Sequence, residues 1–245
     1  MNIRLTALLF ISTLTVGILT SQGKKLVNDI SFIGNETLSK KTLTSELHLK
    51  SKRFLKVYPF KERALKLDIL SIKNKYISNG FLDVEVTSST TDINGRFVDI
   101  NYHITEGNRY FLTEIIITGN ELFTDAELLK LLSLQTGDIY NPFLFSKFIS
   151  EIEYLYHTKG KILVKIATDI SQENNLVASE IIIQEGETYY ISNVNISGVI
   201  NYPHKFILRE LTFGAGDIYN VQQIEKSQSR IFSSGLFSSV EFQPT

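Results

Sequence analysis

The chain has 245 residues, of which 43% are hydrophobic and 21% are charged, a balance typical of globular proteins that argues against wholesale disorder. Its 25 basic and 26 acidic residues are spread along the chain and give a formal net charge of −1, which excludes the basic footprint of a nucleic-acid-binding protein. No cysteine is present, so the chain has neither disulfides nor a lipid-modified N-terminal cysteine.

Residues 1–23 have the pattern of a secretory signal peptide. Arg4 supplies a positive start, residues 5–19 are mainly apolar, and residues 20–23 are small and polar. The alternative is a membrane anchor, but about 15 apolar residues interrupted by serine and threonine are fewer than the roughly 20 that a spanning helix needs. We therefore expect export, with cleavage after Gly23, and the absence of cysteine is compatible with a periplasmic location.

An internal repeat organises the rest of the chain. The sequence Gly-Asp-Ile-Tyr-Asn at 137–141 returns unchanged at 216–220, an offset of 79 positions, and Glu106-Gly107 recurs at the same offset as Glu185-Gly186. Glycines anchor an earlier, less regular copy. The sequence thus predicts three units after the signal peptide at 1–23: unit one at 24–108, unit two at 109–187, and unit three at 188–245, which is expected to be truncated before its last strand.

Unit one is predicted to run strand, short helix, long helix, strand, strand. Its first strand ends at Gly34, and apolar residues at helical spacing predict a long helix that ends at Gly80. Beyond Gly80 the period changes to two, which predicts a second strand containing Leu82, Val84 and Val86. A two-residue turn at Asn94-Gly95 should return the chain as a third strand.

Unit two repeats this order. Gly119 follows its first strand, Thr124 and Glu127 form the pattern of a capping box, and Gly160 ends the long helix. Alternating Ile162, Val164 and Ile166 predict the second strand, which we expect to turn through a looser loop at 172–175. Unit three should have its first strand before Gly198, Pro203 near the first turn of its short helix, and a second strand after Gly235.

The predicted fold class is α+β, as tandem β-α-α-β-β units, each a three-stranded mixed sheet covered on one face by two helices. Almost no linker separates the units, so neighbours should touch through a small fixed joint while each keeps its own core. The glycines that close strands and helices are expected to be turn residues: Gly34, Gly119, Gly80, Gly160 and Gly235.

Tandem units of this order and length, with a Gly-Asn-like turn after strand one and a Gly-aspartate-aromatic stretch before helix two, resemble the POTRA (polypeptide-transport-associated) family. The series is similar to the periplasmic arms of BamA-type outer-membrane assembly proteins, although no barrel is present in this chain. The resemblance implies a location at the periplasmic face of the outer membrane of a Gram-negative type envelope. It implies three kinds of partner: unfolded outer-membrane protein precursors, periplasmic accessory proteins, and a C-terminal barrel in the full-length protein.

In that family, partners are implied to bind by adding a β-strand to the exposed edge formed by strand two, without ATP. The residues carried over as candidates are Leu82, Val84, Val86, Ile162, Val164, Ile166, Phe81 and Leu236. For the six aliphatic strand residues the sequence favours a core role, and the backbone itself would then be the binding feature. For Phe81 and Leu236 a core role and an exposed contact are equally good interpretations. The arm of a two-partner-type secretion transporter, or an envelope scaffold module, is the alternative function.

An enzyme is not expected. The four histidines stand at no metal-ligand spacing and there is no cysteine to join them, so we predict no metal site. Neither a glycine-framed serine nor a phosphate loop occurs. We also expect no catalytic residues, no cofactor, no small-molecule substrate and no nucleic-acid partner.

Overall fold

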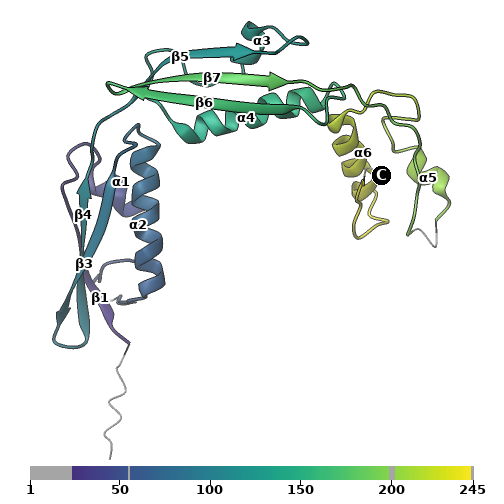
Figure 1. Cartoon of the computed structure of the whole chain (residues 1–245). Helices are drawn as coiled ribbons and strands as arrows, with labels where there is room; N and C mark the ends of the chain where they lie inside the picture. The colour runs from purple at the N-terminus through teal and green to yellow at the C-terminus, as the bar shows by residue number, and fades with distance from the viewer. Residues whose placement is uncertain (1–23, 55, 199–201, 244–245) are drawn as a thin grey trace, which may run out of the picture.

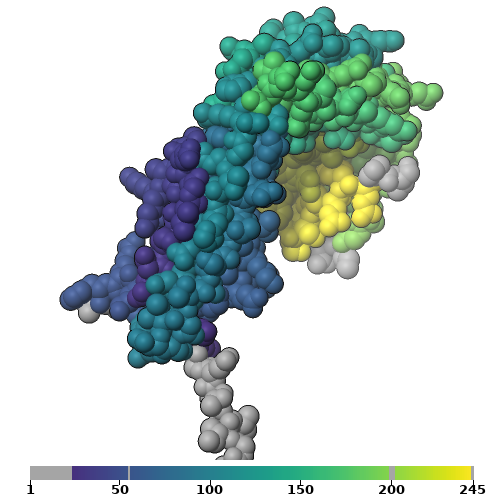
Figure 2. All heavy atoms as spheres, turned by 60° about the vertical axis from the view of Figure 1, so that its left-hand side comes forward, coloured from purple at the N-terminus to yellow at the C-terminus, as the bar shows by residue number. Residues whose placement is uncertain are grey.

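The computed structural model describes residues 24–54, 56–198 and 202–243, so the predicted signal peptide lies outside the described residues. The units follow one another as a bent arm (Figure 1), with unit one upright, unit two lying across its top and unit three turned downward. Figure 2 shows unit two as a broad cap above the other two units. The predicted tandem α+β architecture is confirmed.

Unit one contains a mixed sheet whose central strands are the first and last of the unit. Its elements are β1 (Leu26–Ile33), α1 (Lys40–Ser45), β2 (Tyr58–Pro59), α2 (Glu62–Ile77), β3 (Glu85–Ile93) and β4 (Phe97–Thr105). The strand order is β2-β1-β4-β3, with β4 parallel to β1 and antiparallel to β3. The short strand β2 was not predicted, and it pairs with the first two residues of β1.

Unit two has the three-stranded sheet that the sequence predicted. Its elements are β5 (Phe111–Thr118), α3 (Asp125–Leu129), α4 (Pro142–His157), β6 (Lys165–Glu173) and β7 (Leu176–Gln184), and the strand order is β5-β7-β6. The predicted capping box is present at the start of α3, where Thr124 and Glu127 bond each other's backbone. The Asn141 side chain caps α4 by accepting from the backbone N–H groups of Phe143 and Leu144.

Each of these two units has its own hydrophobic core between the helices and one face of the sheet. In unit one the stripe of α2 that includes Ile72 and Tyr76 packs on β1 and β4, and in unit two α4 places Ile152 and Tyr156 against β5 and β7. All four side chains are fully buried. The separation of the cores means that each unit supplies its own folding free energy from apolar burial.

A buried carboxylate in α2 fastens a loop of unit one. Asp68 is fully buried and accepts from the backbone N–H groups of His48 (2.5 Å) and Leu49 (3.2 Å) and from the hydroxyl of Tyr102 (2.8 Å). Burial, and then the nearby charge of Asp68, raise the pKa of Tyr102 above its usual range, so the phenol stays a donor. Unit two has the apolar Phe148 at the corresponding position, so it cannot form this hydrogen-bond network.

The glutamate of each repeated Glu-Gly pair joins three elements at the end of the third strand. Glu106 accepts from the hydroxyl of Tyr76 (2.8 Å) and from both the backbone N–H (2.8 Å) and the hydroxyl (2.6 Å) of Thr37. Glu185 likewise accepts from the hydroxyl of Tyr156 (2.9 Å) and the backbone N–H of Leu122 (2.7 Å). This shared role accounts for the recurrence of the glutamate at the repeat offset.

These bonds predict an acid-sensitive contribution to the stability of unit one. Burial alone would raise the pKa of Glu106, but the hydrogen bonds from Thr37 and Tyr76 outweigh it and hold the pKa below its usual value. Because the folded-state pKa is depressed, the stabilisation is complete above the unfolded-state value of about 4.3 and is lost as the pH falls through the folded-state pKa.

We therefore expect Glu106→Gln to destabilise unit one by about 1.5–3 kcal/mol at pH 7, the usual range for hydrogen bonds to a charged group. The difference between variant and parent should be smaller at pH 3 than at pH 7, because it declines once the pH falls below the unfolded-state pKa of about 4.3. Hydrogen exchange of the β4 amides measures it at both pH values. A difference that does not change with pH would show that the charge of Glu106 contributes nothing.

Both hairpin turns differ from the predicted lengths. The turn between β3 and β4 takes three residues, Asn94 to Arg96, instead of two, and the turn between β6 and β7 is the tight pair Asn174-Asn175 instead of a looser loop. The two asparagines have φ values of +49° and +66°. Asparagine adopts this left-handed conformation more readily than most residues, which is why an Asn-Asn pair serves as a two-residue turn.

Unit three keeps its helices but has no ladder of strands. Helices α5 (His204–Leu208) and α6 (Val221–Ser233) are present, whereas the described residues on either side form only the isolated bridge between Tyr190 and Ile218. The predicted strands of this unit are therefore wrong for the chain as described. In the other units the outer strands pair with β4 or β7 and not with each other, and residues 202–243 contain no equivalent of that central strand.

Candidate strand-binding edges

Strand two lies at the edge of the sheet in both complete units. Within the described residues, β3 pairs with β4 alone and β6 pairs with β7 alone, so one side of each strand carries backbone N–H and C=O groups without a ladder partner. The opposite edge of unit one is partly covered, because β2 pairs with the start of β1. Such an edge is a template for an incoming strand.

The exposed side chains of the two edges are mainly small and polar. On β3 they include Thr87, Ser89 and Thr91, and on β6 they include Thr168 and Asp169. Small polar side chains leave the backbone accessible, while β6 adds the half-exposed Ile170. The arrangement can accept a strand through main-chain hydrogen bonds with little sequence preference.

A shallow groove accompanies the edge of unit two. It has a volume of about 250 Å³ and lies between α4, which contributes Phe145 and Ile149, and β6, which contributes Thr168 and Ile170. An added strand at β6 could place alternate side chains over this apolar groove. Sequence reasoning missed the groove, although Ile170 falls on the alternation that begins at Ile166 and gave a signal.

The structure separates the predicted edge residues into three groups. Val86 and Ile166 lie on β3 and β6, half-buried with their side chains on the helix-covered face. Phe81, Val84 and Val164 precede the strands and are buried at 5%, 2% and 8% exposure, so they belong to the cores.

The last group lies away from both edges. Leu82 packs on the core of unit two, Ile162 lines a cavity of unit three, and Leu236 is 43% exposed in the loop after α6. Strand two therefore begins later than predicted, at Glu85 and Lys165, because the residues after each glycine form a turn that fills the joint with the next unit.

The repeated Gly-Asp-Ile-Tyr-Asn stretch forms the joint between units. At the second joint Tyr189 donates its backbone N–H to Gly160 (2.9 Å), and Tyr219 donates to the carbonyl of Tyr189 (2.9 Å). Ile218 of the repeated stretch lies against Gly160 of the preceding unit. The same contacts join Gly80, Tyr110 and the first copy of the stretch. Sequence reasoning found the repeat but did not predict its contact with the preceding unit.

The five predicted turn glycines all have positive φ, from +71° at Gly235 to +87° at Gly80. Two kinds of close approach distinguish them. A Cβ added at Gly34 or Gly119 would lie nearest to a carbonyl oxygen of the third strand. A Cβ added at Gly80 or Gly160 would lie nearest to the isoleucine side chain of the following unit.

Among the residues that the structure describes, no group of three or more histidine, aspartate and glutamate residues could hold a metal ion. Within the same residues, no helix combines the length and the apolar character needed to cross a membrane.

Comparisons with known proteins agree with this geometry. The chain is 28% identical over 229 residues to a putative outer membrane protein assembly factor of Treponema pallidum, covering 89% of this chain and 27% of the relative. It is 28% identical over 203 residues to the outer membrane protein assembly factor BamA of Neisseria meningitidis, covering 76% of this chain and 26% of the relative. The chain thus spans about a quarter of the length of these relatives.

A solved structure shows the same fold. The crystal structure of Haemophilus influenzae BamA POTRA3-5 superposes with a TM-score of 0.65 at 20% identity, covering 91% of both chains. The family described as "POTRA: Surface antigen variable number repeat" matches three times, at residues 26–107, 110–186 and 189–245. These three matches cover nearly the whole sequence after the predicted signal peptide, and the chain belongs to the POTRA family.

Proposed function

We propose that the chain is the periplasmic arm of a machine that assembles and inserts outer-membrane β-barrel proteins. The arm holds unfolded precursors and accessory proteins by strand addition, without ATP, and works beside a C-terminal barrel of the full-length protein. The relatives named as outer membrane assembly factors support the process. The observation that carries the binding mode is the free edge of β6 above an apolar groove.

The chemistry of the clients fits this edge. A barrel precursor consists of segments of about ten residues in which apolar and polar side chains alternate. Such a segment, once paired with β6, would satisfy the free N–H and C=O groups of that edge and place every second side chain over Phe145, Ile149 and Ile170. Binding of this kind needs no nucleotide, because the main-chain hydrogen bonds and apolar burial supply the free energy.

A disulfide test separates the edge from the middle of the sheet. Asp169 of β6 and Glu180 of β7 are directly paired, so they lie on the same face of the sheet, and both are exposed. Because the chain has no cysteine, Asp169→Cys and Glu180→Cys each introduce a unique thiol. A disulfide needs Cα atoms about 4.4–6.8 Å apart, a distance that a strand added at β6 reaches only from position 169.

The probe is a ten-residue peptide with the sequence of a barrel strand and one cysteine, activated as a mixed disulfide with thiopyridine, so that exchange with the protein thiol releases thiopyridone. We expect it to form a disulfide with Asp169→Cys in preference to Glu180→Cys by about tenfold or more, with or without ATP, since one strand spacing is about 4.8 Å. Alternate amides of the peptide point toward β6 and away from it. N-methylation of the set that points toward β6 should abolish the reaction, whereas N-methylation of the other set should not. Equal reaction at both cysteines, or indifference to N-methylation, would refute strand addition at this edge.

A further inference from the structure

Unit one carries a basic loop, residues 50–56, that has no counterpart in the other units. The connection between its two helices runs over residues 46–61, and the corresponding connections at 130–141 and 209–220 are four residues shorter. Four of the seven residues of the basic loop are Lys50, Lys52, Arg53 and Lys56, and none is acidic. Each of the other two connections has one basic residue and at least one acidic residue. In a chain whose net charge is −1, this loop is therefore a local concentration of positive charge.

The basic loop lies at the end of unit one that points away from unit two. It precedes the start of α2, whereas the other end of that helix leads to Gly80, which accepts a backbone bond from Tyr110 of unit two (Figure 1). Figure 2 shows this part of the chain as a projection at the lower left of the molecule. The loop is thus remote from the joint and from the edge of β6.

Backbone hydrogen bonds hold the loop in shape. Arg53 donates its N–H to the carbonyl of Lys56 (2.8 Å), and Lys56 donates back to Arg53 (3.0 Å), which closes a tight turn. Lys52 fastens the base of the loop to β1 by donating to the carbonyl of Asn28 (3.1 Å). Phe54 lies in the turn and is 97% exposed. The loop therefore presents an aromatic ring to water, where its apolar surface gains nothing from burial.

The cations of the loop are not neutralised by carboxylates. Within the described residues, none of its four basic side chains forms an ion pair. The Nζ atom of Lys52 lies 5.0 Å from the centre of the Phe97 ring, and that of Lys56 lies 5.9 Å from the centre of the Tyr58 ring. These aromatic contacts position both ammonium groups and leave their charge available to an anion.

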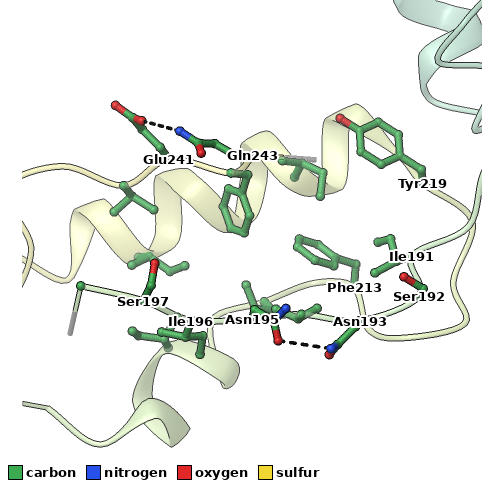
Figure 3. A pocket seen from close by; sticks show the side chains of 18 of the residues that line it. Ile191, Ser192, Asn193, Asn195, Ile196, Ser197, Phe213, Tyr219, Glu241 and Gln243 are labelled. Atoms are coloured by element: carbon green, nitrogen blue, oxygen red, sulfur yellow. Dashed lines mark hydrogen bonds between the residues drawn. The ribbon is translucent and has the colours of Figure 1, made fainter. Parts of the chain in front are cut away.

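The shape of the loop favours a bilayer over a protein as its partner. In unit three, Ile196 and Phe213 line a cavity of about 670 Å³ (Figure 3), but Phe54 projects outward from a turn. A stable protein interface engages about 20–30 residues on each side, far more than this tip presents. A bilayer requires no matching surface, because its headgroups rearrange around an inserted side chain.

We propose that the basic loop binds the surface of a bilayer that contains anionic phospholipid. Phe54 enters the boundary between the headgroups and the acyl chains, and the four cations contact the phosphate groups around it. Complementary charge brings the loop to the surface, and apolar burial of the ring retains it there. This site goes beyond strand binding, since it fixes the end of the arm that is remote from unit two to a membrane surface.

The test measures binding to vesicles of phosphatidylethanolamine and phosphatidylglycerol by co-sedimentation. It uses the chain from Lys24, the form expected after cleavage, because the apolar residues 5–19 would bind lipid themselves. We expect this chain to bind these vesicles and not vesicles of phosphatidylcholine. Phe54→Ser, and separately the pair Arg53→Gln with Lys56→Gln, should each lower the partition coefficient by at least about tenfold.

Two matched controls separate the loop from the general surface. Lys40→Gln with Lys41→Gln removes the same charge from exposed positions on α1 of the same unit. Phe232→Ser removes a phenyl ring that is 57% exposed on α6. Both controls should bind vesicles as the parent does. Hydrogen exchange of the β4 amides shows that unit one stays folded in every variant.

A tryptophan reports whether the tip enters the bilayer. The chain contains no tryptophan, so Phe54→Trp introduces a unique one at the tip. We expect its emission to shift to shorter wavelength when phosphatidylglycerol vesicles are added, because the indole leaves water. The emission of Phe232→Trp on α6 should not change.

Four results would overturn the proposal. They are no binding to phosphatidylglycerol vesicles, an equal loss of binding in the controls, an unshifted tryptophan emission at position 54 in the bound protein, and Phe54-dependent binding of soluble polyglutamate, which would assign the loop to an acidic protein. The test uses no strand peptide, and the loop lies in another unit than Asp169. Failure here therefore leaves the proposed function intact, and failure of the disulfide test leaves the membrane site intact.

Discussion

Replacing Gly119 with alanine should bring unit two close to unfolding. The new Cβ would lie 2.1 Å from the carbonyl oxygen of Ile183. That oxygen belongs to β7, which pairs with a neighbour on both sides, so it cannot withdraw without breaking a ladder. The φ of +78° alone costs alanine about 1–2 kcal/mol. With the clash added, we expect a loss of roughly 4 kcal/mol or more, a size reached only by defects such as this.

The measurement is hydrogen exchange of the β7 amides, with the β4 amides of unit one as an internal reference. A loss of 4 kcal/mol corresponds to exchange about 10³-fold faster when opening is at equilibrium. Gly137→Ala is the matched control within the same unit, since its φ of +92° is also positive and its Cβ would meet nothing within 4 Å. If both variants were equally affected, backbone strain alone would explain the result and the close approach would be irrelevant.

The periodicity of the sequence predicted the two complete units well, because each side-chain pattern there reports a real packing face. The stripe ending at Tyr76 and Tyr156 is buried, and the capping box at Thr124 is formed. Turn lengths were less predictable. A tight turn needs two residues with positive φ, and the Asn174-Asn175 pair supplies them without a glycine. A search for glycines in the sequence therefore does not find this turn.

The errors in unit three have a different physical origin. Val194 and Ile196 have the alternation of a first strand, and alternation reports which face of a segment is apolar. A strand, however, exists only if a neighbour accepts its hydrogen bonds, and that neighbour is the central strand in the complete units. The pattern therefore survives in unit three although the ladder is not formed.

The candidate site was half predictable for a related reason. That strand two is an edge followed from the family resemblance, and the structure places β3 and β6 there. The sequence did not predict which side chains near this edge face a partner. Apolar residues after a glycine have the same pattern whether they belong to the strand or to the joint between units. Leu82 and Ile162 are of the second kind, and only the tertiary contacts with the next unit distinguish them.

Alanine at Gly160 should change the angle between units two and three without unfolding either. A Cβ at this position would lie 2.8 Å from the Cγ2 atom of Ile218, 2.9 Å from the carbonyl oxygen of Tyr189 and 3.0 Å from the Cγ2 atom of Thr188. Two of these atoms are side-chain ends that can turn away, but the carbonyl accepts the backbone bond from Tyr219 and is part of the joint itself. Relief of the clash therefore requires the joint to open.

Spin labels can report this opening, because the absence of cysteine allows one pair of thiols to be placed at will. Glu173→Cys at the end of β6 and Ser229→Cys on α6 are exposed and lie in different units. We expect Gly160→Ala to shift or broaden the distribution of distances between the two labels. The hydrogen bond from the Tyr154 hydroxyl to Glu225 (2.8 Å) crosses the same joint, and we expect it to be lost.

Gly235→Ala is the control for the joint. Gly235 ends helix α6 as Gly160 ends α4, and its φ is +71° against +79°, yet an added Cβ would meet nothing within 4 Å. Both alanines bear similar backbone strain, so only contact with a following unit differs between them. If the two variants gave the same distance distribution, the repeated Gly-Asp-Ile-Tyr-Asn stretch would not set the angle. A change confined to Gly160→Ala would identify the contact between Ile218 and Gly160 as what fixes the bend of the arm.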